Sequence, residues 1–88
     1  MLTPIFENTF KKDIKRLQKR DKDMKKLKIV IEKLLEKQDL EPKYKDHALI
    51  GNWNGYRDCH IEPDWLLIYR TSETNLFLAR SGSHSDLF

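Results

Sequence analysis

Cysteine, glycine, proline and long apolar runs are all scarce in this sequence of 88 residues. The only cysteine, Cys59, has no partner for an internal disulfide, so we expect a reducing, cytoplasmic environment. The longest apolar run, residues 65–69, is far shorter than the roughly 20 residues that cross a bilayer. The N-terminal residues lack the basic start and apolar stretch of a secretory signal. These absences predict one soluble domain over residues 1–88 with no membrane partner.

Positive charge is concentrated in the first half of the chain. Residues 11–28 hold ten Lys or Arg and three Asp, a net charge of +7, whereas the rest holds seven basic and eleven acidic residues, a net charge of −4. Such a cationic segment favours a polyanion, and nucleic acid is the obvious one, although a solvated helix face is an equal alternative. The lysines that we expect to contact RNA are Lys15, Lys19, Lys22, Lys25 and Lys26.

Apolar spacing predicts a short N-terminal strand followed by an antiparallel pair of helices. Residues 2–7 fit an edge strand, because Pro4 cannot donate a hydrogen bond to a neighbouring strand. Asn8 or Thr9 is the candidate cap of the first helix, and Asp21 or Asp23 that of the second. The two apolar stripes consist of Phe10, Ile14 and Leu17, then Met24, Leu27, Ile31 and Leu34, which Val30 and Leu35 widen.

The second half of the chain has the features of β-structure. After a loop over residues 43–49, Asn54-Gly55 predicts a type I′ hairpin between strands at 50–53 and 56–62. Residues 65–70 are apolar enough for a central strand, and residues 76–81 form the last one. The order predicts an α+β fold: an N-terminal strand, an antiparallel two-helix hairpin, then a small, mainly antiparallel sheet. Alternation turns Cys59 and Ile61 toward the helices and His60 toward the open face.

All three histidines lie in this second half, at His47, His60 and His84, together with Asp64 and Arg80. Cleavage of RNA by its own 2′-hydroxyl needs a base, an acid for the departing 5′-oxygen, and positive charge for the crowded phosphorane. Histidine suits either proton-transfer role, because its free pKa is about 6.5. The grouping therefore predicts a nuclease site that needs no metal.

Each group has a candidate role in such a site. His84 is the predicted general acid, and Arg80 on the same segment stabilises the phosphorane. Asp64 is the favoured general base, with His60 as its rival or its orienting partner. His47 positions the RNA backbone.

Structural alternatives remain open for several of these residues. Trp65 and Phe88 could stack on unpaired bases, but Trp65 could equally lie in the core, as we expect of Trp53. Phe88 could instead be disordered or plug the edge of the core. The Arg80 side chain could form a structural ion pair, with Asp58 or Glu62.

Zinc is a weaker possibility. Three histidines and an aspartate are acceptable ligands, but they lack the close spacing of a zinc motif. Cys59 and His60 are neighbours on a predicted strand and face opposite ways. We therefore expect no metal and no small-molecule cofactor.

The segment YKDHALIGNWNGYRDCHIEPDWLLIY (residues 44–69) resembles the YafQ-type toxins of the RelE/ParE superfamily of bacterial toxin–antitoxin systems. The likeness extends upstream to KRDKDM (residues 19–24) and downstream to RSGSH (residues 80–84) and the final Leu87-Phe88. It implies a RelE-like fold and a ribosome-dependent mRNA endonuclease that acts in the A site beside ribosomal RNA. It also implies inhibition by a DinJ-type antitoxin. The family's functional positions correspond here to His47, His60, Asp64, Trp65, Arg80, His84 and Phe88.

Two other functions fit parts of the sequence. A non-enzymatic toxin of the ParE branch would bind a topoisomerase, but pure binding has no need of clustered histidines. A basic nucleic-acid-binding module would need only the lysine-rich residues 11–28.

Overall fold

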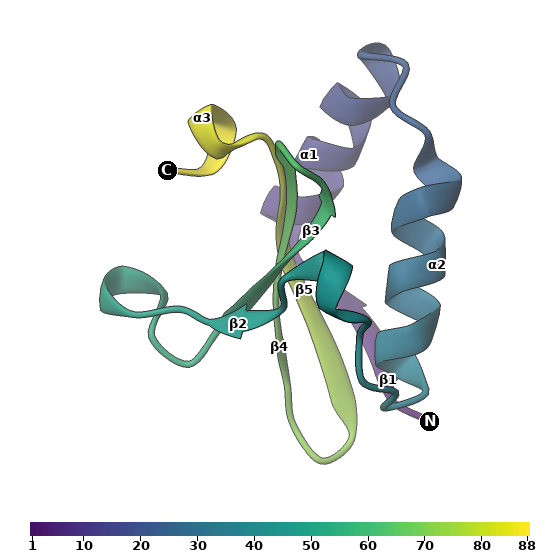
Figure 1. The fold of residues 1–88 in the computed structure, drawn as a ribbon, viewed down its shortest axis with the longest axis vertical. Helices are drawn as coiled ribbons and strands as arrows, with labels where there is room; N and C mark the ends of the chain where they lie inside the picture. The colour runs from purple at the N-terminus through teal and green to yellow at the C-terminus, as the bar shows by residue number, and fades with distance from the viewer.

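The computed structural model describes residues 1–88 and has the predicted α+β architecture. Strand β1 (Thr3–Phe6) is followed by helices α1 (Asn8–Lys19) and α2 (Met24–Leu35), which run antiparallel on one side of a sheet (Figure 1). Strands β2 (His47–Ala48), β3 (Arg57–Glu62), β4 (Trp65–Thr71) and β5 (Asn75–Gly82) complete that sheet. A short helix, α3 (His84–Leu87), ends the chain. No helix has the length and apolar character that a membrane span requires.

The sheet is mixed, with the strand order β1-β5-β4-β3-β2. The N-terminal strand β1 lies at one edge and pairs in parallel with β5, and Pro4 stands there as predicted. The other pairs are antiparallel, and the apolar strand β4 is central, as its composition predicts.

The main core lies between the helix pair and the sheet. Both predicted helical stripes face it: Phe10, Leu17, Leu27, Val30 and Leu34 are buried, while Ile14, Met24, Ile31 and Leu35 pack at its margin. From the sheet, Cys59 and Ile61 point into the same core, as the alternation of β3 predicts. The caps are only partly as predicted. Asp23 caps α2 by accepting from the Lys25 N–H (3.1 Å), but Glu7 precedes α1 without a side-chain cap.

The segment before β3 differs from the prediction. Residues 50–53 are not a strand, because Gly51–Trp53 form a 3-10 helix, η2, and the strand lies earlier, at β2. The Asn54-Gly55 turn has extended Asn54 backbone angles (φ −55°, ψ 133°) and positive φ only at Gly55 (92°). These are the angles of a type II turn rather than type I′, closed by a hydrogen bond from the Tyr56 N–H to the Trp53 carbonyl (2.9 Å).

The face of the sheet away from α1 and α2 is not left bare. Leu66, Ile68 and Ala79 form a second small cluster there with Leu87 of α3. Leu49, Trp53 and Tyr56 pack against it from the β2–η2 segment, so Trp53 has the structural role that we expected. Figure 1 shows α3 and the β2–η2 segment on this side, opposite the helix pair. Between them they frame the part of the sheet that carries the histidines.

Candidate active site

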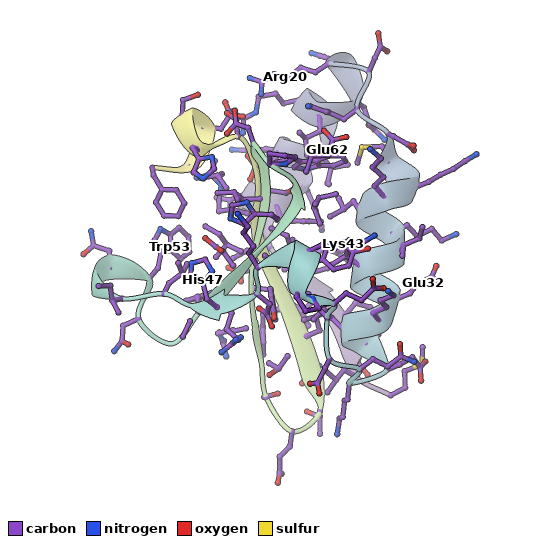
Figure 2. The ribbon with its side chains drawn as sticks, in the orientation of Figure 1. Arg20, Glu32, Lys43, His47, Trp53 and Glu62 are labelled. Atoms are coloured by element: carbon purple, nitrogen blue, oxygen red, sulfur yellow. The ribbon has the colours of Figure 1, made fainter.

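The three histidines come together on this second face of the sheet. Asp58 lies opposite Ile68 across β3 and β4, and opposite His47 across β2 and β3, so its carboxylate belongs to the face away from the core. His60 is two residues further along β3 and faces the same way. Its ring lies near that of His84, with the ring centroids 5.7 Å apart and the planes inclined at 63°. In Figure 2, His47 lies on the side of the sheet opposite α2.

His84 is held by Asp64, which lies in the turn between β3 and β4. One carboxylate oxygen, Oδ1, accepts from the His84 backbone N–H (2.9 Å) and lies 2.6 Å from its Nδ1. These hydrogen bonds from His84 hold the pKa of Asp64 below its usual value, so its carboxylate is ionised and acts only as an acceptor. The proton of a neutral His84 therefore lies on Nδ1, and Nε2 is the nitrogen left for a substrate.

His47 is oriented in a similar way by its own loop. Its Nδ1 donates to the Lys45 carbonyl oxygen (2.7 Å) and lies 3.2 Å from Asp58 Oδ1. Asp58 is only 4% exposed, and its Oδ1 has no hydrogen-bond partner. Burial raises the pKa of Asp58, whereas His47, His60 and His84 oppose that rise through their charges. Asp58 is thus a buried acid in contact with His47 and within the electrostatic reach of His60 and His84, and its place in the site was not predicted from the sequence.

Arg80 forms the structural ion pair that the sequence left open, but with neither expected partner. Its Nε donates to Asp13 Oδ2 (2.7 Å) and its Nη2 to Asp13 Oδ1 (3.1 Å). Asp13 is 2% exposed and also accepts from the Ser81 backbone N–H (3.0 Å). The reason is topological: β1 covers β5 only as far as Leu78, and α1 covers the edge beyond it. A quarter of the Arg80 side chain stays exposed.

Trp65 is completely buried in the main core, so the prediction that it stacks on bases is wrong and the core alternative is correct. The register of β3 and β4 shifts between His60 and Glu62, and Trp65 then lies opposite Glu62. The ring points toward the helices, where its Nε1 donates to Ser81 Oγ (3.0 Å). Phe88, in contrast, is 62% exposed and does not plug the core, so a contact with RNA stays a prediction.

The lysines expected to contact RNA divide into two groups. Lys22 and Lys26 bind the two oxygens of the Glu62 carboxylate, at 3.3 and 2.8 Å. Both charges are therefore partly compensated. The side chains of Lys15, Lys19 and Lys25 are exposed and form no ion pair.

Helix α3, which carries His84, is fixed at both ends of its first turn. Ser83 and Asp86 form a capping box: the Asp86 N–H donates to Ser83 Oγ, and the Ser83 N–H to Asp86 Oδ2. The Asp86 carboxylate also accepts from both Arg20 amino groups (2.6 and 3.1 Å), and these bonds hold its pKa far below the usual value. This helix was not predicted, although the S-x-x-D pattern of residues 83–86 is a sequence signal for a capped helix start.

The arrangement suits proton transfer better than thiol chemistry. No group of three or more His, Cys, Asp or Glu side chains is placed to hold a metal ion. Cys59 is buried, and burial raises the pKa of its thiol well above the usual range, so it stays neutral and inert. The residues brought together are His47, His60 and His84, with the carboxylates of Asp58 and Asp64 beside them.

Comparisons with known proteins identify the family of this chain. The sequence matches the family described as the bacterial toxin of type II toxin–antitoxin system, YafQ, over residues 2–88. An Escherichia coli protein named mRNA interferase toxin YafQ is 46% identical over 84 residues, which cover 94% of this chain and 91% of that protein. The prediction of an mRNA interferase agrees with that name.

Two solved structures have the same fold. A copper-bound mutant toxin from Helicobacter pylori superposes with a TM-score of 0.96 at 42% identity, covering 100% of both chains. An Escherichia coli DinJ–YafQ complex gives a TM-score of 0.92 at 44% identity, covering 100% of this chain and 99% of that one. Together with the family match, these comparisons confirm the predicted resemblance and fold: this chain belongs to the YafQ toxin family of bacterial type II toxin–antitoxin systems.

Proposed function

We propose that this chain is an endoribonuclease that cuts mRNA in the ribosomal A site, by attack of a ribose 2′-hydroxyl on the adjacent phosphate. One observation carries the proposal: the rings of His60 and His84 lie 5.7 Å apart, with His84 oriented by Asp64. Two imidazoles at this separation can flank one phosphate, one removing a proton while the other supplies one. The mRNA interferase name of the Escherichia coli relative supports the same activity.

The contacts of Asp64 support His60 as the base in this proposal. Asp64 Oδ1 already accepts from His84, and the lowered pKa of this carboxylate makes it a weak acceptor for the proton of the 2′-hydroxyl. His60, half-buried on β3, has no side-chain hydrogen bond within the chain and can accept that proton. Asp64 then acts as a positioning residue that favours the charged form of His84, the general acid.

In the proposed step, His60 takes the 2′-hydroxyl proton as the 2′-oxygen bonds to phosphorus. The bond from phosphorus to the 5′-oxygen breaks, and His84 donates a proton to that oxygen. The products are a 2′,3′-cyclic phosphate and a free 5′-hydroxyl. Arg80, held by Asp13, offers the remaining exposed part of its guanidinium to the phosphorane charge. His47 holds the RNA backbone, and Phe88 stacks on a base.

The exposed lysines supply affinity for the ribosome in this proposal. Lys15, Lys19 and Lys25 dock on ribosomal RNA, while Lys22 and Lys26 do so less strongly because Glu62 shares their charge. Since translated messages are the substrate, the activity belongs to the cytoplasm.

A DinJ-type antitoxin is the proposed partner, as in the Escherichia coli DinJ–YafQ complex. The antitoxin could pack against the helices or against an exposed sheet edge, and we favour the helices. An open apolar groove runs between α1 and α2, where Phe6 is 45% exposed and Ile14, Met24 and Ile31 are partly exposed. An apolar antitoxin segment fits this groove better than RNA does.

Two measurements test the reaction. Programmed ribosomes should yield a message fragment ending in a 2′,3′-cyclic phosphate, and no fragment should form without ribosomes. A message with 2′-deoxyribose at the cut site should bind but resist cleavage. Cleavage of that message at the normal rate would show that the 2′-hydroxyl is not the nucleophile. The topoisomerase-binding alternative predicts intact messages and damaged DNA in cells that express the protein.

A further inference from the structure

A second cavity lies directly beside the histidines, on the other side of β3. It has a volume of about 500 Å³ and lies between α2, the 3-10 helix η1 (Pro42–Tyr44) and the last residues of β3. His60 borders both this cavity and the proposed active site. In Figure 2, Lys43 and Glu62 lie on the side of the sheet that faces α2. A molecule that extends past His60 would therefore enter this cavity.

The edge of β3 is open along the cavity. Strand β2 pairs only with Arg57 and Asp58, so the same edge has no strand partner from Cys59 to Glu62. The backbone N–H and C=O groups on such an edge can bind the polar rim of a base. Ile29, which is 50% exposed, and Tyr44 add apolar surface on the opposite wall. This combination of polar edge and apolar wall suits the base of one unpaired nucleotide. The cavity volume of about 500 Å³ is also large enough, since ligand sites in proteins begin at about 300 Å³.

The charges around the cavity favour the phosphates of such a nucleotide. Lys26 is compensated by Glu62 (2.8 Å), the one carboxylate on the wall. Lys43 and Lys45 also line the cavity, and neither forms an ion pair. Two cations that form no ion pair thus stand at its rim, and Lys43 also lies 5.1 Å from the centre of the Tyr44 ring.

Lys45 links the cavity to the histidines through its backbone. It has a positive φ of 48°, which is uncommon for a residue other than glycine, and its carbonyl oxygen accepts from His47 Nδ1 (2.7 Å). Its backbone therefore orients a histidine of the site while its side chain borders the cavity.

We propose that this cavity binds one unpaired nucleotide of the message next to the cut bond, with its phosphate on Lys43 and Lys45 and its base between Ile29 and the edge of β3. The proposal rests on the proposed function and names where the substrate strand continues. The cavity thereby fixes the position of the strand relative to His60.

The test uses a combined Lys43→Gln and Lys45→Asn variant, because asparagine tolerates the left-handed backbone at position 45. Lys37→Asn is the control, since Lys37 is an exposed lysine outside residues 11–28 and has a similar φ of 58°. Single-turnover cleavage in purified programmed ribosomes gives a half-saturating protein concentration and a maximal rate. We expect the first variant to raise that concentration about tenfold with the maximal rate within twofold, and the control to change neither. An unchanged half-saturating concentration in the first variant would overturn the proposal.

A second arm identifies the RNA that the lysines bind. Each phosphate flanking the cut is replaced in turn by an uncharged methylphosphonate. At one linkage this replacement should weaken binding of the wild-type protein and leave binding of the Lys43/Lys45 variant unchanged, because the lysines that contact that phosphate are already absent. If the replacement weakens both proteins by the same factor at every linkage, the lysines bind ribosomal RNA and the message assignment is wrong. Binding of a 2′-deoxy message to the wild-type protein and to the Lys43/Lys45 variant can be compared even if no cleavage occurs. Failure of the nuclease proposal can therefore be told apart from failure of the nucleotide-site proposal.

Discussion

Asp64 Oδ1 lies 2.6 Å from His84 Nδ1 and 2.9 Å from the backbone nitrogen of the same residue. One carboxylate oxygen therefore fixes both the ring and the start of the helix that carries it. The two residues are 20 positions apart in the sequence, and β4 and β5 lie between them. In the proposed mechanism, this contact makes Asp64 a partner of the acid rather than the base.

Replacing Asp64 with asparagine should slow single-turnover cleavage by about 10- to 100-fold, because the amide can accept the same hydrogen bonds but does not stabilise a charged His84. The remaining rate should still need the His60 imidazole, so adding His60→Ala to the Asp64 variant should lower it by at least a further ~10-fold. Glu73→Gln, at the exposed tip between β4 and β5, serves as the control. A double variant that cuts as fast as Asp64→Asn alone would return the base role to Asp64.

A His84→Ala variant should cut a normal message about 100- to 10,000-fold more slowly and still bind ribosomes. A message with sulfur in place of the departing 5′-oxygen should restore its rate to within about tenfold of wild type, since a thiolate leaves without a proton. His60→Ala should stay slow on both messages, because the 2′-hydroxyl proton must still be removed. Equal rescue of both variants would contradict the division of roles.

The Asp13 side chain should contribute more to stability than any exposed acid. It is buried and binds the guanidinium groups of Arg80 and Arg16 and the Ser81 N–H, so Asp13→Ala leaves these donors without an acceptor. We expect the free energy of unfolding to fall by about 3–5 kcal/mol in urea titrations. Asp39→Ala, at an exposed site, should change it by less than about 0.5 kcal/mol. A loss below 1 kcal/mol for Asp13→Ala would show that the cluster is not a structural anchor.

Asp86 should make stability depend on pH at acidic values. Its pKa in the folded protein is below the unfolded value of about 3.9, so the stabilisation is complete above pH 5 and is lost as the pH falls through the folded pKa. Asp86→Asn should therefore lower the free energy of unfolding by about 1 kcal/mol at pH 7. The difference from wild type should shrink progressively below about pH 4 in urea titrations. A difference that is constant from pH 7 to 2.5 would exclude this ionisation as the cause.

Trp65→Phe separates a core role from a role in binding RNA. The variant loses the hydrogen bond from Nε1 to Ser81 Oγ and part of the ring volume, so the free energy of unfolding should fall by about 1–3 kcal/mol. At 20 °C, where the folded form still dominates, cleavage should stay within about twofold of wild type. A large rise in half-saturating concentration without loss of stability would show that the indole contacts RNA after all.

Local pattern alone was sufficient for most of the fold. The spacing of Phe10, Ile14 and Leu17 specified the buried side of α1, and the alternation of β3 placed Cys59 inward and His60 outward. These patterns work because a helix and a strand each have a fixed period, so one face is determined wherever one side is buried. The pattern failed in residues 47–53, where a strand of two residues and a 3-10 helix are too short to produce a period.

The sequence by itself determined which chemical groups the site could contain: three histidines, their carboxylate neighbours and an arginine, in an order that resembles the YafQ toxins. Only the tertiary structure decided how those groups are paired. Arg80 meets Asp13, 67 positions away, because β1 ends early and leaves the edge of β5 to α1. The register shift between β3 and β4 places Glu62 opposite Trp65, on the face of the sheet where Lys22 and Lys26 bind its carboxylate. Such pairings depend on where separate elements end in space, which no local period encodes.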